Sequence, residues 1–263
     1  MTARVIAIDW SGARQGAPKK IWLAEFRGGQ PFDVPRNKID PSEIVKYLVS
    51  TCAQHPNTVV GIDFAFSFPS WFIADQRCKT AKEVWGHVER NGERWLTECR
   101  DPFWGKPGQK NPRRPEEQQY RKTDSDIHVK STRPKSIFQV GGAGAVGTGS
   151  IRGMPILRRL HGEGFSIWPF HPDGWPRVIE IWPRALTGEV DKSRCSARRQ
   201  YISSRYDWLP DEWKLRAEDS EDAFDAVMSA IQMNKHLCEL ESLKQETDPQ
   251  YLMEGRIWQP ETA

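Results

Sequence analysis

The chain has 263 residues, enough for one large α/β domain with a core of its own. Its 38 Lys and Arg residues outnumber its 35 Asp and Glu residues by only three, so net charge alone does not indicate a nucleic-acid-binding protein. The five cysteines contain no CxxC pair, which argues against a zinc cluster or a disulfide framework. We find no signal peptide and no apolar run of about 20 residues, so we expect a soluble, cytoplasmic protein without membrane contact.

The first part of the chain alternates predicted strands and a helix. Residues 5–9 and 20–26 are rich in β-branched and aromatic side chains and are joined by a polar turn, which predicts a hairpin. A helix is expected from Pro41 to about Ala53, followed by a strand over 58–68. A further strand at 31–36 is only weakly indicated because it contains two prolines.

Residues 70–175 lack this regularity and are predicted to form a long irregular insertion. Helices are expected at 81–96 and 151–161, but 102–134 is dense in Pro, Gly, Lys and Arg and is typical of a loop. Regular structure is predicted again as a strand at 177–182 and helices at 194–206 and 220–240. The whole pattern predicts a single α/β domain over 1–263, with a mixed sheet flanked by helices and an insertion at 70–175.

Two acidic residues end apolar strands. Asp9 follows Val5–Ile8 and Asp63 follows Val59–Ile62. An unpaired carboxylate beside buried residues is costly unless it is hydrogen-bonded or bound to a cation. Each residue by itself has a simpler explanation, since an Asp at the end of a strand often caps the next turn.

A C-terminal helix carries two more carboxylates. Asp222 and Asp225 are three residues apart and therefore neighbours on one helix face. An apolar stripe is expected on the opposite face, formed by Phe224, Val227, Met228 and Ile231. The helix dipole alone explains an acid in the first turn, as at Asp222, but explains Asp225 less well.

These acids suggest a metal site. Carboxylates gathered at one point repel one another and need a cation, and all-oxygen ligands suit Mg²⁺ or Mn²⁺. Asp9, Asp63, Asp222 and Asp225 are the predicted ligands and catalytic residues. Glu180, in the 177–182 strand, is a fifth catalytic candidate, as a ligand or an outer partner; the alternative is a salt bridge with Arg177 or Arg184.

The order of four short motifs resembles that of a known family. The motifs are Ile8-Asp9-Trp10-Ser11-Gly12, Gly61-Ile62-Asp63, Glu180-x-x-Pro183 and Glu221-Asp222-x-x-Asp225-Ala226. They resemble the family called domain of unknown function 429, predicted ribonuclease-H-like nucleases related to Holliday-junction resolvases. Glu254-Gly255-Arg256-Ile257 is similar to the closing segment of that family. The resemblance spans about 1–70 and 177–260, and it implies a ribonuclease-H-like fold and a divalent-metal site for phosphodiester hydrolysis.

A basic segment supplies candidate contacts to the substrate. Residues 106–135 hold nine basic and four acidic side chains, with aromatic residues among and beside them. Basic side chains interleaved with aromatic ones suit a nucleic-acid strand, although a solvated loop has the same composition. The predicted substrate-binding residues are Ser11, Arg113, Arg114, Arg121 and Lys122. Neither DNA nor RNA is favoured, and no oligomeric state is predicted.

Other functions remain open at this stage. Gly142-x-Gly144-x-x-Gly147 matches a dinucleotide fingerprint, but the run from Gly141 to Gly149 is more typical of a flexible loop. An actin-like phosphotransferase or ATPase would use Asp9-Trp10-Ser11-Gly12 as a phosphate loop. A third possibility is a non-catalytic module that binds nucleic acid or protein.

Overall fold

The computed structural model describes residues 3–37, 39–130 and 132–261. The protein is a mixed α/β structure with two compact units. The first unit contains the described residues up to Asp63, Trp175–Leu243 and the chain from Trp258 onward. The second contains Phe64–Gly174 and Lys244–Ile257, so it includes nearly all of the predicted insertion and a C-terminal segment besides.

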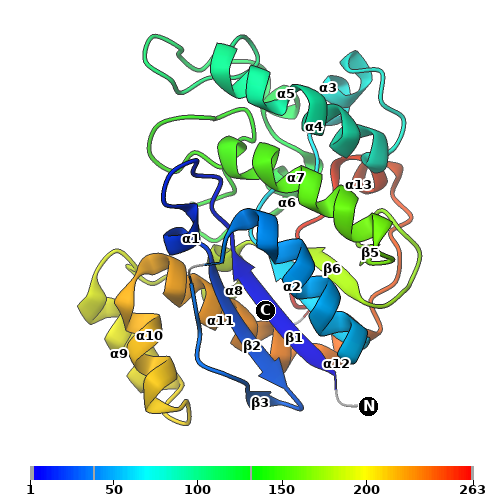
Figure 1. The fold of residues 1–263 in the computed structure, drawn as a ribbon. Helices are drawn as coiled ribbons and strands as arrows, with labels where there is room; N and C mark the ends of the chain where they lie inside the picture. The colour runs from blue at the N-terminus through cyan, green and yellow to red at the C-terminus, as the bar shows by residue number, and fades with distance from the viewer. Residues whose placement is uncertain (1–2, 38, 131, 262–263) are drawn as a thin grey trace. The chain divides into compact units, whose positions relative to one another are not determined.

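A mixed sheet forms the centre of the first unit (Figure 1). The sheet has six strands in the order β3-β2-β1-β4-β6-β5, and all of them except β5 belong to the first unit. In the first unit the bounds are β1 Arg4–Asp9, β2 Trp22–Arg27, β3 Gln30–Pro31, β4 Thr58–Ile62 and β6 Arg177–Glu180. Strand β1 pairs antiparallel with β2 and parallel with β4, and β4 pairs parallel with β6. The predicted hairpin is confirmed, whereas the strand expected over 58–68 ends at Ile62.

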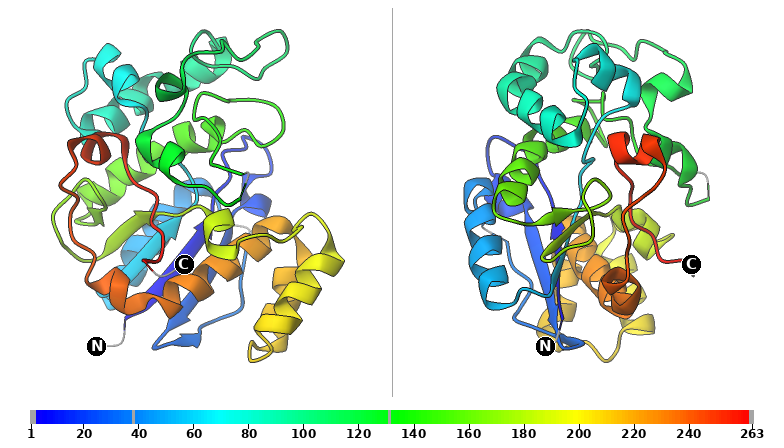
Figure 2. Two further views of the ribbon diagram at one scale, coloured as in Figure 1. Left: turned by 180° about the vertical axis from the view of Figure 1, so that it is seen from behind. Right: turned by 90° about the vertical axis from the view of Figure 1, so that its right-hand side faces the viewer.

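Helices cover both faces of this sheet. In the edge-on view of Figure 2, α2 (Pro41–Gln54) lies on one side of the strands and α11 (Glu221–Lys235) on the other. Gly61 faces α11, because a Cβ atom built on it would lie 2.6 Å from the Met233 sulfur. Side chains alternate along a strand, so Asp63 and its neighbour Asp9 share that face with Gly61.

Helix α11 is enclosed rather than amphipathic. It packs against β1, β2, α8 (Pro183–Thr187) and α10 (Asp211–Asp219), and residues 223–231 are all buried. The expected division into an apolar stripe and an acidic face is therefore wrong, because a helix with neighbours all round buries its whole circumference. Ser220 caps its N-terminus by accepting a hydrogen bond from the Ala223 amide at 3.1 Å. The helix expected over 220–240 ends at Lys235, and α12 (Leu237–Glu241) follows as a separate turn.

The remaining elements of the first unit are short. They are α1 (Ala17–Lys20) and α9 (Cys195–Arg205), the second of which confirms the helix expected over 194–206.

The second unit is mainly helical. The long helices α4 (Ala81–Glu98) and α7 (Gly147–Gly162) pack against each other and confirm the two helices expected in this part of the chain. The shorter elements are α3 Ser70–Asp75, α5 Glu116–Gln119, α6 Lys122–Asp126, β5 Ser166–Ile167 and α13 Pro249–Glu254.

The C-terminal segment is anchored in the second unit by Glu254. Its carboxylate is buried and accepts hydrogen bonds from the Ser70 amide at 2.7 Å and the Lys122 amide at 2.6 Å. The Ile257 amide donates to Thr123 at 2.9 Å. Ser70 and Lys122 are the first residues of α3 and α6, so one buried acid satisfies an N-terminal amide of each helix.

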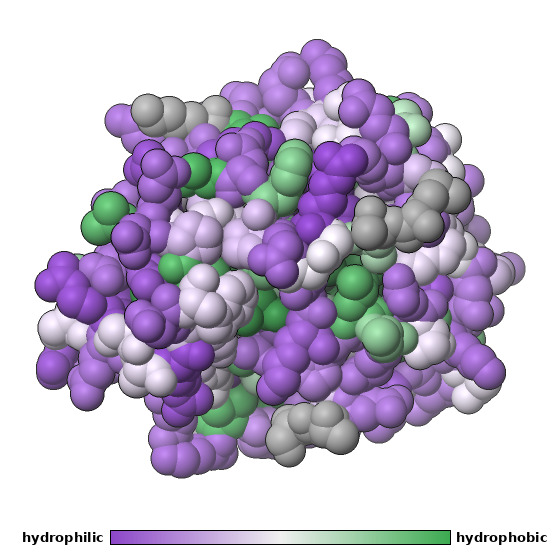
Figure 3. Space-filling view, turned by 90° about the horizontal axis from the view of Figure 1, so that it is seen from below, coloured by the Kyte–Doolittle hydropathy of each residue, from purple (hydrophilic) through white to green (hydrophobic). Residues whose placement is uncertain are grey.

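The surface shown in Figure 3 is mostly hydrophilic. Within 3–37, 39–130 and 132–261, no helix has the length and apolar character that crossing a membrane requires.

Gly61 provides a test of how closely α11 must approach the sheet. Replacing it with Val would force the side chain into Met233 and Ile181, since even a Cβ atom would lie 2.6 and 3.0 Å from their nearest atoms. We expect the free energy of unfolding in urea to fall by about 1–3 kcal/mol. Gly162→Val is the matched control, because a Cβ atom there meets nothing within 4 Å. An equal effect of both substitutions would contradict this account of the packing.

Candidate metal centre

Two of the predicted acids lie at the ends of neighbouring parallel strands. Asp9 is the last residue of β1, and Asp63 follows directly after β4. The Asp63 amide donates to the Ile8 carbonyl oxygen at 3.0 Å, which fixes the register of the two strand ends. Neighbouring strands are about 4.8 Å apart, so both carboxylates start from adjacent points on the α11 side of the sheet.

Helix α11 brings the other two acids to this place. Asp225 is buried, with 5% of its surface exposed, and Asp222, a turn earlier, is half-buried. Burial raises the pKa of Asp9 well above its ordinary value, and repulsion from Asp225, Asp63 and Asp222 adds to the shift. The structure therefore places all four predicted ligands within electrostatic range of one another.

The pKa values of Asp63 and Asp225 are raised, like that of Asp9. Burial, followed by repulsion from Asp225, raises the pKa of Asp63 to about 8. Burial also raises the pKa of Asp225, although its ion pair with Lys192 works against the shift. Each carboxylate is thus charged at a cost in free energy at neutral pH, as expected for groups that share too few positive charges.

Glu180 lies at the edge of this group. It ends β6, opposite Ile62 in the register, and is buried. Its charge contributes to the raised pKa of Asp63. Because Asp63 is the residue after Ile62, strand alternation directs Glu180 to the other face of the sheet, which favours a role as an outer partner over direct ligation.

Lys192 belongs to the cluster and was not found from the sequence. It lies between α8 and α9, and its ammonium group forms an ion pair with the Asp225 carboxylate. Burial opposes its positive charge, but Asp225, Asp63 and Asp9 outweigh burial and raise its pKa. In the sequence it is one of several basic residues in a polar loop, with nothing to set it apart.

Two buried oxygen atoms of α11 have no hydrogen-bond partner among the residues that the structure describes. They are Oδ1 of Asp225 and Oγ of Ser229, and both residues are almost fully buried. Residues four apart on a helix are neighbours on its surface, so the two atoms belong to one face. Buried polar atoms are nearly always satisfied by protein, water or an ion, and this pair therefore marks a place where such a species is expected.

The donor set suits a hard divalent cation. Lys192 acts on all four carboxylates, while Lys20 acts on Asp222 and Arg184 on Asp225. The pKa values of the four acids are raised despite these cations, and the ligand atoms are all oxygen. Among the described residues, no three His, Cys, Asp or Glu side chains are arranged closely enough to hold a metal ion together. The acids are thus within range of one another but not gathered around a common point, and Lys192 holds the carboxylate that a cation would need.

Two of the basic residues predicted to contact substrate are engaged within the protein. Arg121 is only 1% exposed, and its guanidinium binds Asp124 and the Glu254 carbonyl oxygen. The prediction that Arg121 binds substrate is therefore wrong: the side chain is an internal part of the second unit. Lys122 is half-buried and pairs with Asp126 at 2.9 Å.

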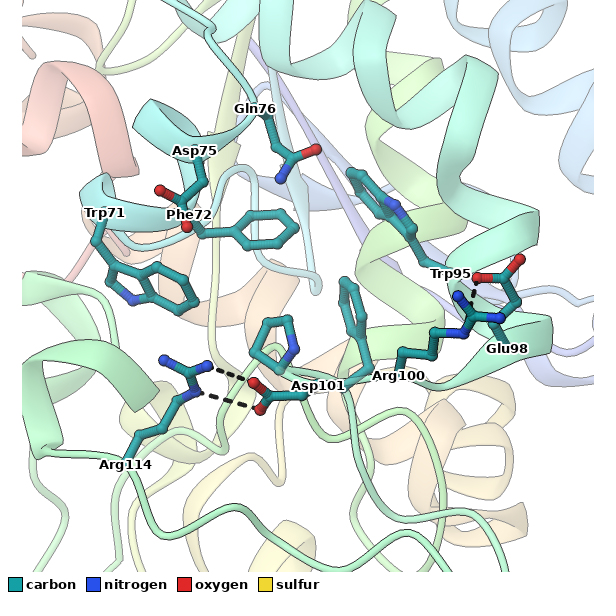
Figure 4. Close-up of a pocket in the computed structure, with 11 residues that line it drawn as sticks. Trp71, Phe72, Asp75, Gln76, Trp95, Glu98, Arg100, Asp101 and Arg114 are labelled. Atoms are coloured by element: carbon teal, nitrogen blue, oxygen red, sulfur yellow. Dashed lines mark hydrogen bonds and ion pairs between the residues drawn. The ribbon is translucent and has the colours of Figure 1, made fainter.

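Arg114 is also engaged within the protein. It pairs with Asp101 and lies over the Trp71 ring, at 4.9 Å from the ring centre (Figure 4). These residues line a cleft of about 240 Å³ in the second unit. Arg113 is exposed, so of the four predicted basic contacts it is the most accessible.

The turn at Ser11 and the glycine-rich loop were also candidate binding segments. The hydroxyl of Ser11 accepts a hydrogen bond from the Ala13 amide at 3.3 Å, which shapes the turn after Asp9. The 136–140 segment before the glycine-rich loop forms only an isolated bridge, Trp104 with Gln139, and no strand. The strand that a dinucleotide fingerprint requires is therefore not found at these residues.

Comparison with known proteins identifies no relative. A scan against family models, a search of curated proteins and a search of solved structures each found no match to this chain.

The raised pKa values predict how stability depends on pH. An Asp63 carboxyl with a pKa of about 8 in the fold and about 4 in the unfolded chain binds more protons when folded. The contribution of Asp63 to stability without metal is therefore greatest below about pH 4 and falls as the pH rises towards 8. In EDTA, we expect a lower Tm at pH 8 than at pH 5.5, and a smaller fall in Asp63→Asn.

Asp40→Asn is the control for this measurement. Asp40 caps α2, and its hydrogen bonds with Ser42 lower its pKa, so it is ionised throughout this pH range. Its substitution should leave the fall in Tm between pH 5.5 and 8 unchanged. If Tm fell as steeply with pH in Asp63→Asn as in the parent protein, the raised pKa of Asp63 would be refuted.

The Lys192 pair can be tested by a double-mutant cycle. Lys192→Met leaves the buried Asp225 without its counter-ion, and we expect a loss of about 2–3 kcal/mol at pH 8, because Lys192 is partly exposed. Adding Asp225→Asn should recover most of this loss in urea unfolding. Lys46→Met, which breaks an exposed pair with Glu43, should change stability by less than about 0.5 kcal/mol. Additive effects of the two substitutions would show that the pair does not stabilise the fold.

Proposed function

We propose that this protein is a divalent-metal-dependent nuclease that hydrolyses phosphodiester bonds at the cluster of Asp9, Asp63, Asp222 and Asp225. The observation that carries the proposal is that burial and repulsion from neighbouring acids raise the pKa values of all four acids. Among the described residues, Lys192 is the one ammonium group that acts against this shift at every one of them. Protein interiors avoid unbalanced charge unless a function needs it. A cation-binding site for phosphoryl chemistry is such a function.

The position of each residue in the cluster indicates its role in the proposed reaction. Bound Mg²⁺ or Mn²⁺ supplies Lewis-acid stabilisation of the phosphoryl oxygens and lowers the pKa of the attacking water. Asp9, Asp63 and Asp225 would hold the cation from three elements if they came closer together than they lie in this structure, with Asp222 at the rim and Glu180 behind Asp63. Lys192, which is paired with Asp225, would be the residue placed to bind a substrate phosphate.

The fold assignment is part of this proposal. A mixed sheet with β1 and β4 parallel, each followed or ended by an Asp, agrees with the ribonuclease-H-like arrangement that the four motifs imply. The finer family, domain of unknown function 429, rests on those motifs. We also propose a cytoplasmic location, since all five cysteines are free thiols.

The test is cleavage of labelled single-stranded, duplex, hybrid and branched substrates with Mg²⁺, Mn²⁺ or EDTA. We expect activity only with a divalent cation, and a loss of about 100-fold or more in Asp9→Asn and Asp225→Asn, since each removes a ligand. Asp40→Asn, on the exposed cap of α2, is the matched control and should keep full activity.

A second measurement separates metal binding from turnover. Calorimetry with Mn²⁺ should show binding to the parent protein that Asp225→Asn weakens and Lys192→Met strengthens, because Lys192 competes for the same carboxylate. Cleavage that survives both Asp9→Asn and Asp225→Asn, or metal binding indifferent to Asp225, would reject the site.

A further inference from the structure

The second unit has a basic groove beside α4. The groove has a volume of about 450 Å³, and four exposed cations line it: Arg77, Lys82, Arg90 and Arg158. Arg77 precedes α4, Lys82 and Arg90 lie on it, and Arg158 comes from α7. The acidic residue Glu83 also lines the groove, and Arg158 is paired with Glu89. An anion that bridges the other three cations, Arg77, Lys82 and Arg90, would be bound favourably.

Acidic side chains near the groove are already engaged. Glu83 accepts a hydrogen bond from the Lys79 amide at 2.6 Å and sits in the first turn of α4, where the helix dipole favours its charge. Glu89 pairs with Arg158. In the part of the chain that the structure describes, Arg77, Lys82 and Arg90 form no ion pair.

Two guanidinium groups of the groove lie over the same glycine of α4. A Cβ atom built on Gly86 would lie 3.5 Å from Nη1 of Arg90 and 3.6 Å from Nε of Arg158, so both groups lie over the same point of α4. Glycine within a helix costs about 1 kcal/mol relative to alanine. The two groups are thus close enough for one anion to contact both, and Arg158 would then share its charge between that anion and Glu89.

The spacing of the charges favours a polymer over a single phosphate. Lys82 and Arg90 are eight residues apart on α4, which corresponds to about 12 Å along the helix axis. One strand of a duplex advances about 3.4 Å for each nucleotide, so this length spans about three phosphates.

We propose that this groove binds the phosphate backbone of a nucleic acid. The identity of the polymer rests on the proposed nuclease function, whereas the anion-binding character rests on the groove alone. The groove lies outside the basic segment at 106–135, where Arg114, Arg121 and Lys122 are engaged in internal pairs. Contacts with the backbone would position substrate without reading its sequence.

The experiment compares two matched double variants of the full chain. Arg90→Gln/Arg158→Gln removes one cation from α4 and one from α7 in the groove. Arg94→Gln/Arg152→Gln removes one cation from each of the same helices outside the groove, where Arg152 pairs with Glu93 as Arg158 pairs with Glu89. Binding of a fluorescein-labelled oligonucleotide is followed by anisotropy in EDTA, so that cleavage does not interfere.

We expect the groove variant to bind on the order of tenfold more weakly, with its log–log salt slope reduced by about 2. The control variant should bind like the parent protein. Equal loss in both variants, or loss in neither, overturns the proposal. Lys82→Gln is a milder third variant, and a slope reduced by about 1 is expected for it, whereas an unchanged slope also counts against the groove.

Competition identifies the ligand. Inorganic phosphate that displaces the oligonucleotide at an equal phosphate concentration would overturn the assignment to a polymer. If oligonucleotide binding depended on the groove but no metal-dependent cleavage were found, the proposed nuclease function would be rejected. The proposal that the groove binds nucleic acid would still be supported.

Discussion

Repulsion among buried carboxylates is the constraint on which the first unit depends. Asp9, Asp63 and Asp225 each have a raised pKa, and each raises the pKa of at least one of the others or is raised by it. Lys192 offsets only part of this charge. An interior that stabilised folding alone would replace such acids with apolar groups, because an unbalanced buried charge costs several kcal/mol. The proposed metal site rests on this unfavourable cluster.

The fold holds these acids in place by close packing. Parallel pairing of β1 and β4 sets Asp9 beside Asp63, and the absence of a side chain at Gly61 admits Met233 of α11 to the sheet. Helix α11 is buried throughout 223–231, so Asp225 has little freedom to move away from its neighbours. The rigidity that keeps like charges together is thus supplied by apolar contacts on every side of the helix.

The second unit uses its charges in two different ways. Arg121, Asp124 and Glu254 satisfy one another and the backbone, so they stabilise a region with little regular structure. Arg77 and Arg90 have no such partners among the described residues and line an open groove. Whether a basic residue stabilises the fold or faces solvent is decided by what folds against it, and composition alone does not distinguish the two.

The sequence by itself determined the elements that local patterns control. Apolar runs ended by Asp9 and Asp63, the capped helix at Pro41 and the positions of α4, α7 and α11 all follow from side-chain periodicity and turn residues. It also identified four acids of the cluster, because carboxylates at strand ends and on one helix are visible without coordinates. Only the tertiary structure showed that α11 is enclosed, that Lys192 pairs with Asp225 and that Arg121 is buried. These facts depend on contacts between residues far apart in the chain, and no local pattern encodes which distant side chain will supply a charge or exclude water.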